Sequence, residues 1–115
     1  MSIEGTSAKL TGMSVMENAK VVNLTESDTL EVFEQVVYCD STAGAFTVTL
    51  PPVSLAMGKF YTIKLITDNG DVTVQDQDDS YDWAATGDLT LSSITDFGIF
   101  FSDGHKWYEL QSQTT

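Results

Sequence analysis

The sequence contains no arginine and few basic residues of any kind. Its five positive charges are all lysines, against 17 aspartates and glutamates, so the formal net charge is −12 at pH 7. Without guanidinium groups the chain lacks the side chain best suited to gripping a phosphate through two parallel hydrogen bonds. Its negative field also repels nucleic acids and anionic lipid surfaces. We therefore expect neither a nucleic-acid partner nor a membrane partner.

Cysteine and histidine each occur once, as Cys39 and His105. A single cysteine forms no internal disulfide, and its place at the end of an apolar run predicts a small buried hydrophobe. His105 follows Gly104 in a turn-like stretch, which predicts an exposed turn residue. No Cys/His metal cluster, Ser-His-Asp arrangement or phosphate-cradling glycine loop is visible. We expect a chain that is not an enzyme, and a small hydrolase or isomerase is the least favoured of the functions considered.

Long hydrophobic runs are also missing. No segment has the length of apolar sequence that spans a bilayer, and the N-terminus lacks the basic head and apolar run of a signal peptide. At 115 residues the chain has the size of one domain. These features lead us to expect a protein made in the cytoplasm.

Residues 1–19 show no sustained hydrophobic period. Small and polar residues dominate, with isolated apolar ones among them. Such a segment is typically ordered only when a partner buries its apolar side chains. We predict a flexible N-terminal arm that binds its partner through Ile3, Leu10, Met13 and Met16.

Strand patterns begin at Lys20 and continue to Leu110. The clearest is Phe46–Leu50, where apolar and hydroxyl residues alternate with the period of a half-buried strand. Pro51-Pro52 ends it, because proline has no N–H for a ladder, and a second alternating strand starts at Lys59. The predicted core residues are Phe46, Val48, Leu50, Ile63, Leu65, Val72 and Val74.

Turn sequences separate the strands. Asn69-Gly70 and Asp103-Gly104 are the residue pairs that favour tight β-hairpins. The stretch from Thr29 to Cys39 fits both a helical and a strand pattern, and we favour a strand because its β-branched residues cluster before a turn. The domain at 20–110 is thus expected to be all-β, a small antiparallel β-sandwich or barrel of about seven to eight short strands, followed by a polar C-terminal tail at 111–115.

An acidic loop offers oxygen ligands at alternating positions, from Asp76 to Asp82. Carboxylates on a flexible loop suit hard cations, so Asp76, Asp78 and Asp82 are candidate calcium ligands. The loop departs from the EF-hand pattern, because Tyr81 stands where that pattern has glycine and Gly87 where it has glutamate. A solvated acidic loop is the favoured interpretation, and no other cofactor is expected.

Aromatic residues gather near this loop and near the C-terminus. Trp83, Trp107 and Tyr108 would serve as stacking surfaces for a sugar, or would lie in the core or in a subunit interface. The sequence alone leaves both interpretations open.

The order of these elements resembles a β-module found in virion proteins of tailed bacteriophages, in head-decoration, head-fibre and tail-fibre domains. The resemblance covers about residues 30 to 110. The matching residues are Val37, Asp40, Thr42–Ala45, Thr47–Pro52, Gly58, Tyr61–Lys64, Gly70, Val72–Val74, Ser102–Gly104, Trp107 and Tyr108.

This resemblance implies a structural role and a homotrimer. A single module with an N-terminal arm is similar to a capsid decoration (cement) protein, which would sit on the outside of the virion head, bind the major capsid protein and stabilise the shell. The alternative is a receptor- or glycan-binding module of a phage head or tail fibre.

Overall fold

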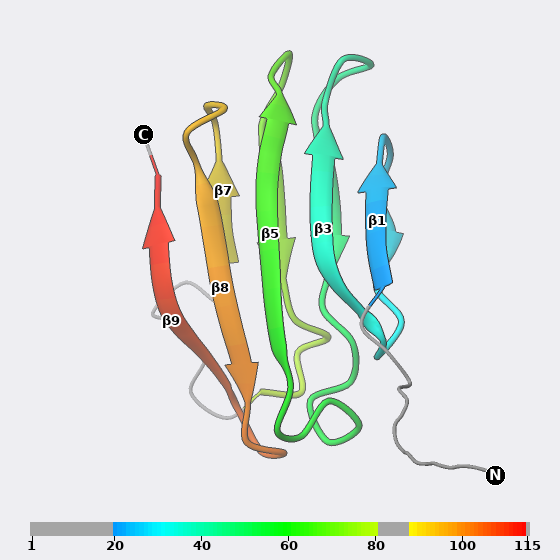
Figure 1. Ribbon diagram of the computed structural model, residues 1–115, viewed down its shortest axis with the longest axis vertical. Helices are drawn as coiled ribbons and strands as arrows, with labels where there is room; N and C mark the ends of the chain where they lie inside the picture. The colour runs from blue at the N-terminus through cyan, green and yellow to red at the C-terminus, as the bar shows by residue number, and fades with distance from the viewer. Residues whose placement is uncertain (1–19, 81–87, 115) are drawn as a thin grey trace, which may run out of the picture.

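The first six strands of this chain lie alternately in two sheets. The computed structural model describes residues 20–80 and 88–114, and every structural statement below concerns those residues. They form no helix and nine strands, which are β1 (Lys20–Leu24), β2 (Asp28–Thr29), β3 (Glu34–Asp40), β4 (Phe46–Thr49), β5 (Phe60–Thr67), β6 (Val72–Gln75), β7 (Asp88–Leu91), β8 (Phe97–Ser102) and β9 (Trp107–Gln113). Sheet A has the order β1-β3-β5-β8-β9, and sheet B has the order β2-β4-β6-β7 (Figure 1).

The alternation makes the first six strands parallel within their sheets. Because β1 to β6 go to the two sheets in turn, the neighbour of each strand is the one two places along, and both run the same way. The last three strands end this pattern, since β7 pairs antiparallel with β6, β8 with β5 and β9 with β8. The chain is therefore a flattened coil, like the turns of a solenoid protein, closed by antiparallel strands.

The expectation of an all-β domain is confirmed, but the sheets are mixed and not purely antiparallel, and the described residues form nine strands where about seven to eight were expected. The reason lies in the turns. Asn69-Gly70 joins β5 to β6, which belong to different sheets, so it is a crossing and not a hairpin. Asn69 Nδ2 donates to the carbonyl of Thr42 at 2.9 Å, and a Cβ at Gly70 would lie 2.5 Å from the nitrogen of Ala45. This turn thus packs against the preceding crossing at Asp40–Ala45.

The hairpin predicted at Asp103-Gly104 is present. It joins β8 and β9, and Ser102 faces Trp107 across the pair. Asp103 Oδ1 accepts hydrogen bonds from the nitrogens of His105 at 2.8 Å and Lys106 at 2.9 Å. Because β8 and β9 share sheet A, a tight turn here folds the chain back on itself.

Two predicted boundaries shift. The strand expected from Thr29 to Cys39 is divided, because a turn at residues 30–33 carries the chain from β2 in sheet B to β3 in sheet A. At the other end β9 continues to Gln113, so most of the segment expected to be a polar tail is strand. The predicted arm at residues 1–19 lies outside the described residues.

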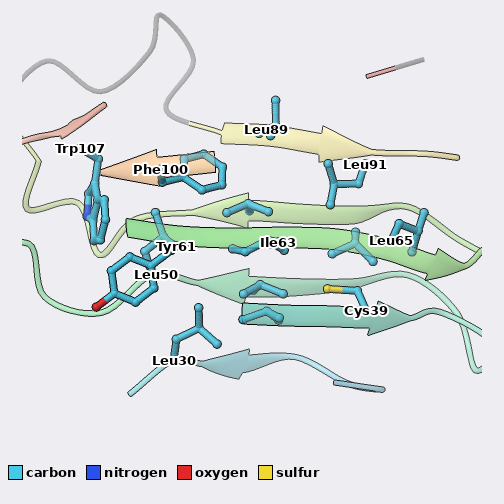
Figure 2. Close-up of a cluster of buried hydrophobic side chains, with 14 of the residues drawn as sticks. Leu30, Cys39, Leu50, Tyr61, Ile63, Leu65, Leu89, Leu91, Phe100 and Trp107 are labelled. Carbon is cyan, nitrogen blue, oxygen red and sulfur yellow. The ribbon is translucent and has the colours of Figure 1, made fainter. Parts of the chain in front are cut away.

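The core fills the space between the two sheets (Figure 2). All seven predicted core residues are buried, which confirms the alternation of β4, β5 and β6. The complete cluster comprises Leu30, Val37, Cys39, Phe46, Val48, Leu50, Val53, Ala56, Tyr61, Ile63, Leu65, Val72, Val74, Leu89, Leu91, Phe100 and Trp107. Both sheets contribute side chains to this cluster. The outer face of each sheet therefore points away from the core.

Side-chain hydroxyls fix the crossings at both ends of the core. Ser41 Oγ donates to the carbonyl of Thr67 at 3.0 Å and accepts from the nitrogen of Asn69 at 2.8 Å. Tyr61 Oη donates to the carbonyl of Val32 at 2.6 Å, and Ser102 Oγ donates to that of Val53 at 2.6 Å. Crossings that leave the ladder of one sheet thereby recover partners for their polar groups.

The core assignment can be tested with two leucines of opposite burial. Leu50 is fully buried and Leu55 is 65% exposed. We expect Leu50→Ala to lower the free energy of unfolding by about 2–5 kcal/mol, through lost burial and a residual cavity. Leu55→Ala should change it by less than about 0.5 kcal/mol. Urea unfolding of both variants checks this, and equal losses would contradict the packing described here.

Candidate functional site

Sheet A turns one side of every strand toward the core and the other outward, as the pleat of a strand dictates. The pairing registers set the outward residues in rows across the sheet. We call the following thirteen residues the outer face of sheet A: Val21, Asn23, Val36, Tyr38, Phe60, Thr62, Lys64, Phe97, Ile99, Phe101, Tyr108, Gln111 and Gln113.

The outer face of sheet A is apolar for a surface that meets water. Eight of its thirteen residues are aliphatic or aromatic, and Lys64 is the one charged residue among them. Glu34, on the same side at the start of β3, lies at the margin of the face opposite Lys20. Val21 is 57% exposed and Phe60 is 52% exposed. Scattered apolar side chains are normal on a surface, whereas a contiguous patch of them marks a contact site for another molecule. This face is the candidate functional site.

One row of the face is aromatic across three strands. The ring centroids of Phe60 and Phe101 lie 4.8 Å apart, and those of Phe101 and Tyr108 lie 6.3 Å apart. Lys106 Nζ sits 4.7 Å from the centroid of the Tyr108 ring, within the range of a cation–π contact. Cross-strand aromatic pairs of this kind stiffen a sheet, so the row presents a preformed apolar surface.

The outer face of sheet B has the opposite character. Thr47, Thr73 and Thr90 face one another across β4, β6 and β7, and Thr29, Thr49 and Gln75 form a parallel row. A shallow groove of about 530 Å³ lies over β2 and β4, lined by Ser27, Asp28, Thr29, Thr47, Thr49 and Gln75. Hydroxyl and amide groups tolerate water well, so this face suits exposure to solvent.

Sequence reasoning did not single out the outer face of sheet A, although β8 carries a signal for it. Strands with one solvated face alternate between apolar and polar residues, whereas strands covered on both faces are apolar throughout. In β8, Phe100 points into the core while Phe97, Ile99 and Phe101 point outward. The continuous apolar run of β8 is therefore the sequence signal that could have pointed to the outer face of sheet A.

The predicted calcium ligands are only partly within the described residues. The carboxylate of Asp76 accepts hydrogen bonds from the nitrogens of Asp78 and Ser80, each at 3.1 Å. Asp79 Oδ2 accepts from the nitrogen of Val53 at 2.9 Å. These carboxylates hold the loop and its neighbour in place. Asp82 lies outside the described residues, and within them no three His, Cys, Asp or Glu side chains gather as a metal site would.

The three aromatic residues proposed to stack on a sugar differ in where they lie. Trp107 is a core residue with a 2% exposed fraction, and its ring meets Tyr61 edge-on at 5.4 Å. Its ring faces are therefore not available to a sugar. Tyr108 is exposed and belongs to the aromatic row. Trp83 lies outside the described residues, as do the predicted binding residues of the arm.

Cys39 behaves as the sequence predicts. It is fully buried in the core, and the loss of hydration there raises the pKa of its thiol to about 12. A thiol that stays protonated at neutral pH is a poor nucleophile. His105 is exposed in the β8–β9 turn, as expected.

Neither a protein-family model nor a curated protein sequence matches this chain. Among the described residues, no helix is long and apolar enough to cross a membrane.

Two turn carboxylates make the fold sensitive to acid. Hydrogen bonds from the hydroxyl and nitrogen of Thr42 lower the pKa of Asp40, and bonds from the nitrogens of His105 and Lys106 lower the pKa of Asp103. A depressed folded-state pKa contributes stability above the unfolded value, near 3.8, that is lost as the pH falls through the folded value. We expect the free energy of unfolding to fall on acidification below pH of about 4, as urea titrations at several pH values will show.

The contribution of these turns can be isolated by substitution. Asp40→Asn and Asp103→Asn remove the titrating group, so each should flatten the loss of stability in acid. Asp71→Asn is the matched control, because the Asp71 carboxylate makes no hydrogen bond with the part of the chain that the structure describes. An acid profile that is unchanged in both turn variants would contradict this assignment.

The acidic loop yields a separate prediction. Because the Asp76 carboxylate is already engaged by two backbone N–H groups, we expect the melting temperature to be the same in millimolar calcium and in chelator. A cation that bound only the folded state would raise it by mass action. A calcium-dependent rise that Asp76→Asn abolishes would establish the site.

Proposed function

We propose that this chain is a non-enzymatic structural protein of a phage virion, a decoration protein that trimerises on the outer surface of the head and stabilises the shell. The observation that carries the proposal is the outer face of sheet A, where eight of thirteen residues are aliphatic or aromatic. A face of this kind suits a protein partner better than it suits solvent or a small polar substrate.

The residues that match the phage β-module support this proposal, because they stabilise the turns of the fold. Asp40 and Thr42 close the crossing between β3 and β4 by hydrogen bonds. Gly58 takes a positive φ of 81° at the end of the turn before β5, a backbone conformation that favours glycine. Asp103 and Gly104 make the β8–β9 turn. Residues that fix the turns and strands of a module are expected in a protein with a structural role.

The charge of the chain fits the same role. A strongly acidic protein remains soluble before assembly and does not bind packaged nucleic acid. The described lysines Lys20, Lys59, Lys64 and Lys106 all belong to strands of sheet A or to the residues just before them. The positive charge is thus concentrated beside the apolar face, as in the rim of a protein interface.

A receptor- or glycan-binding fibre module is the second candidate. The groove over β2 and β4 favours it, since hydroxyl, amide and carboxylate groups there can bond to a polyhydroxylated ligand. The burial of Trp107 removes one of the rings that would stack on a sugar. We therefore place the decoration role first.

The decoration role is tested by binding to undecorated heads. We expect the full chain to bind them and to raise their melting temperature, because several weak contacts act together in an oligomer. Removal of residues 1–19 should weaken binding while leaving the fold and the oligomer nearly intact, since the apolar residues of this arm would be ordered on the capsid. Titration of both proteins onto heads, with a melt of each alone, makes the comparison.

One outcome would count against the decoration role, and two others would count against the role of the arm. If the full chain does not bind heads at micromolar concentration, the decoration role is wrong. If the shortened chain binds as tightly as the full one, the arm is not the anchor, and if it fails to fold, residues 1–19 belong to the core.

A further inference from the structure

We infer that copies of this chain bind one another through the outer face of sheet A. The inference rests on the proposed role as a structural protein, and it specifies which surface makes the contact between subunits. Under this inference, other parts of the chain contact the capsid.

The first argument is the distribution of apolar side chains on the two outer faces. Both sheets belong to the same small domain, yet one outer face carries threonines and glutamine while the other carries Phe60, Ile99 and Phe101. Solvent alone would select polar residues on both. The strand β8 is apolar on its two faces, which is the pattern of a strand that is covered twice. The core covers the inward side of β8, so another protein surface is required to cover its outward side.

The second argument is charge, and it favours a second copy as that protein. Two chains with a net charge of −12 repel each other, and the repulsion is strongest where carboxylates approach closely. On this side of sheet A the carboxylates lie at the two ends of β3, where Glu34 faces Lys20 across the pair and Asp40 adjoins the crossing to β4, and the middle of the face carries none. Other carboxylates lie in the crossings and loops, as at Asp68 and Asp76. The middle of this face is therefore where two copies can meet without opposing carboxylates.

The third argument is shape. The face is built on five hydrogen-bonded strands, and its aromatic row is already fixed by contacts within one chain. Preformed surfaces lose little conformational freedom on binding. Sheets that pack face to face bury such rows about 10 Å apart, as the two sheets of a single domain do. In a dimer two of these faces would stack, and in a trimer three would turn toward the common axis.

The lone charge on the face does not prevent this packing. Lys64 Nζ donates to the carbonyl of Ile94 at 2.7 Å, which draws its ammonium group toward the turn before β8. Its aliphatic stem can line the contact while the charge stays at the margin, as long basic side chains commonly do.

The experiment is light scattering on the full chain and on three variants. The wild type should have a mass that is a multiple of 12.6 kDa at micromolar concentration. Ile99→Asp places a carboxylate in the middle of the face, and Phe60→Asp places one at the more exposed start of β5. Each should weaken association by at least about 30-fold, the effect of losing a central interface residue. Thr73→Asp, on the outer face of sheet B, is the matched control and should leave the mass unchanged.

Salt provides an independent readout. If an apolar contact opposes the repulsion of two acidic chains, raising the ionic strength from about 0.02 M to about 0.3 M should tighten association, because salt screens the repulsion. An interface built on lysine–carboxylate pairs would weaken instead. Thermal melts establish that each variant is folded before its mass is interpreted, and two positions are used so that one unfolded variant does not end the test.

Several results would overturn the inference. They are a wild type that is monomeric at micromolar concentration, folded Ile99→Asp and Phe60→Asp variants that keep the full mass, or a Thr73→Asp variant that dissociates equally. Head binding separates this inference from the proposed function. A wild-type oligomer that does not bind heads would contradict the decoration role and leave the interface standing. A monomer that binds heads would contradict the interface and the trimer and leave head binding standing.

Discussion

The repeated crossing of the chain between two sheets is the constraint on which the rest of the structure depends. Among the first six strands, β3, β4, β5 and β6 place buried side chains in a shared core, and β1 packs partly buried residues against it. Because these strands alternate between the sheets, the core is assembled from both sides as the coil advances. In the crossings, the backbone N–H and C=O groups lie outside the hydrogen-bonded strands, so they need other hydrogen-bond partners. Hydroxyls such as those of Ser41, Tyr61 and Ser102 provide them, which ties the two sheets together at their ends.

A coil of this kind leaves two outer faces, and their difference carries the functional argument. The threonine rows of sheet B can remain in water at little cost. The outer face of sheet A cannot do so as readily, because Val21 and Phe60 are more than half exposed beside other apolar side chains. The antiparallel strands β8 and β9 widen sheet A beyond the coil and carry two members of the aromatic row, Phe101 and Tyr108. The strands that close the fold thus also complete the candidate site.

Much of the fold follows from local sequence. The alternation of Phe46–Leu50 and of the strand from Lys59 sets which residues are buried, and a slip by one residue would have reversed every side chain. The sheet order could not be read in this way, because Asn69-Gly70 has the same turn chemistry whether the chain folds back or crosses to the other sheet. What decides is the packing of that turn against Ala45, which is distant in sequence.

The candidate site was harder to predict than the core. Trp107 and Tyr108 are adjacent aromatics, and only the register of β9 shows that the first is buried and the second exposed. The alternation of β5 places Phe60 on the side opposite Tyr61 and Ile63 and therefore outside the core. Long-range pairing of β5 with β8 then brings it beside Phe101. A surface is formed by several strands together, so the pattern of one strand predicts only the residues that this strand contributes.

The most direct test of the account is the accessibility of methyl groups on the two outer faces, measured by NMR with a soluble paramagnetic agent on the assembled protein. The methyls of Ile99 and Val36 should be protected from relaxation, while those of Thr47 and Thr73 should be strongly relaxed. Dilution to the dissociated state should remove the protection of Ile99 and leave the threonines unchanged. Equal relaxation of Ile99 and Thr73 at every concentration would contradict the claim that another protein surface covers sheet A.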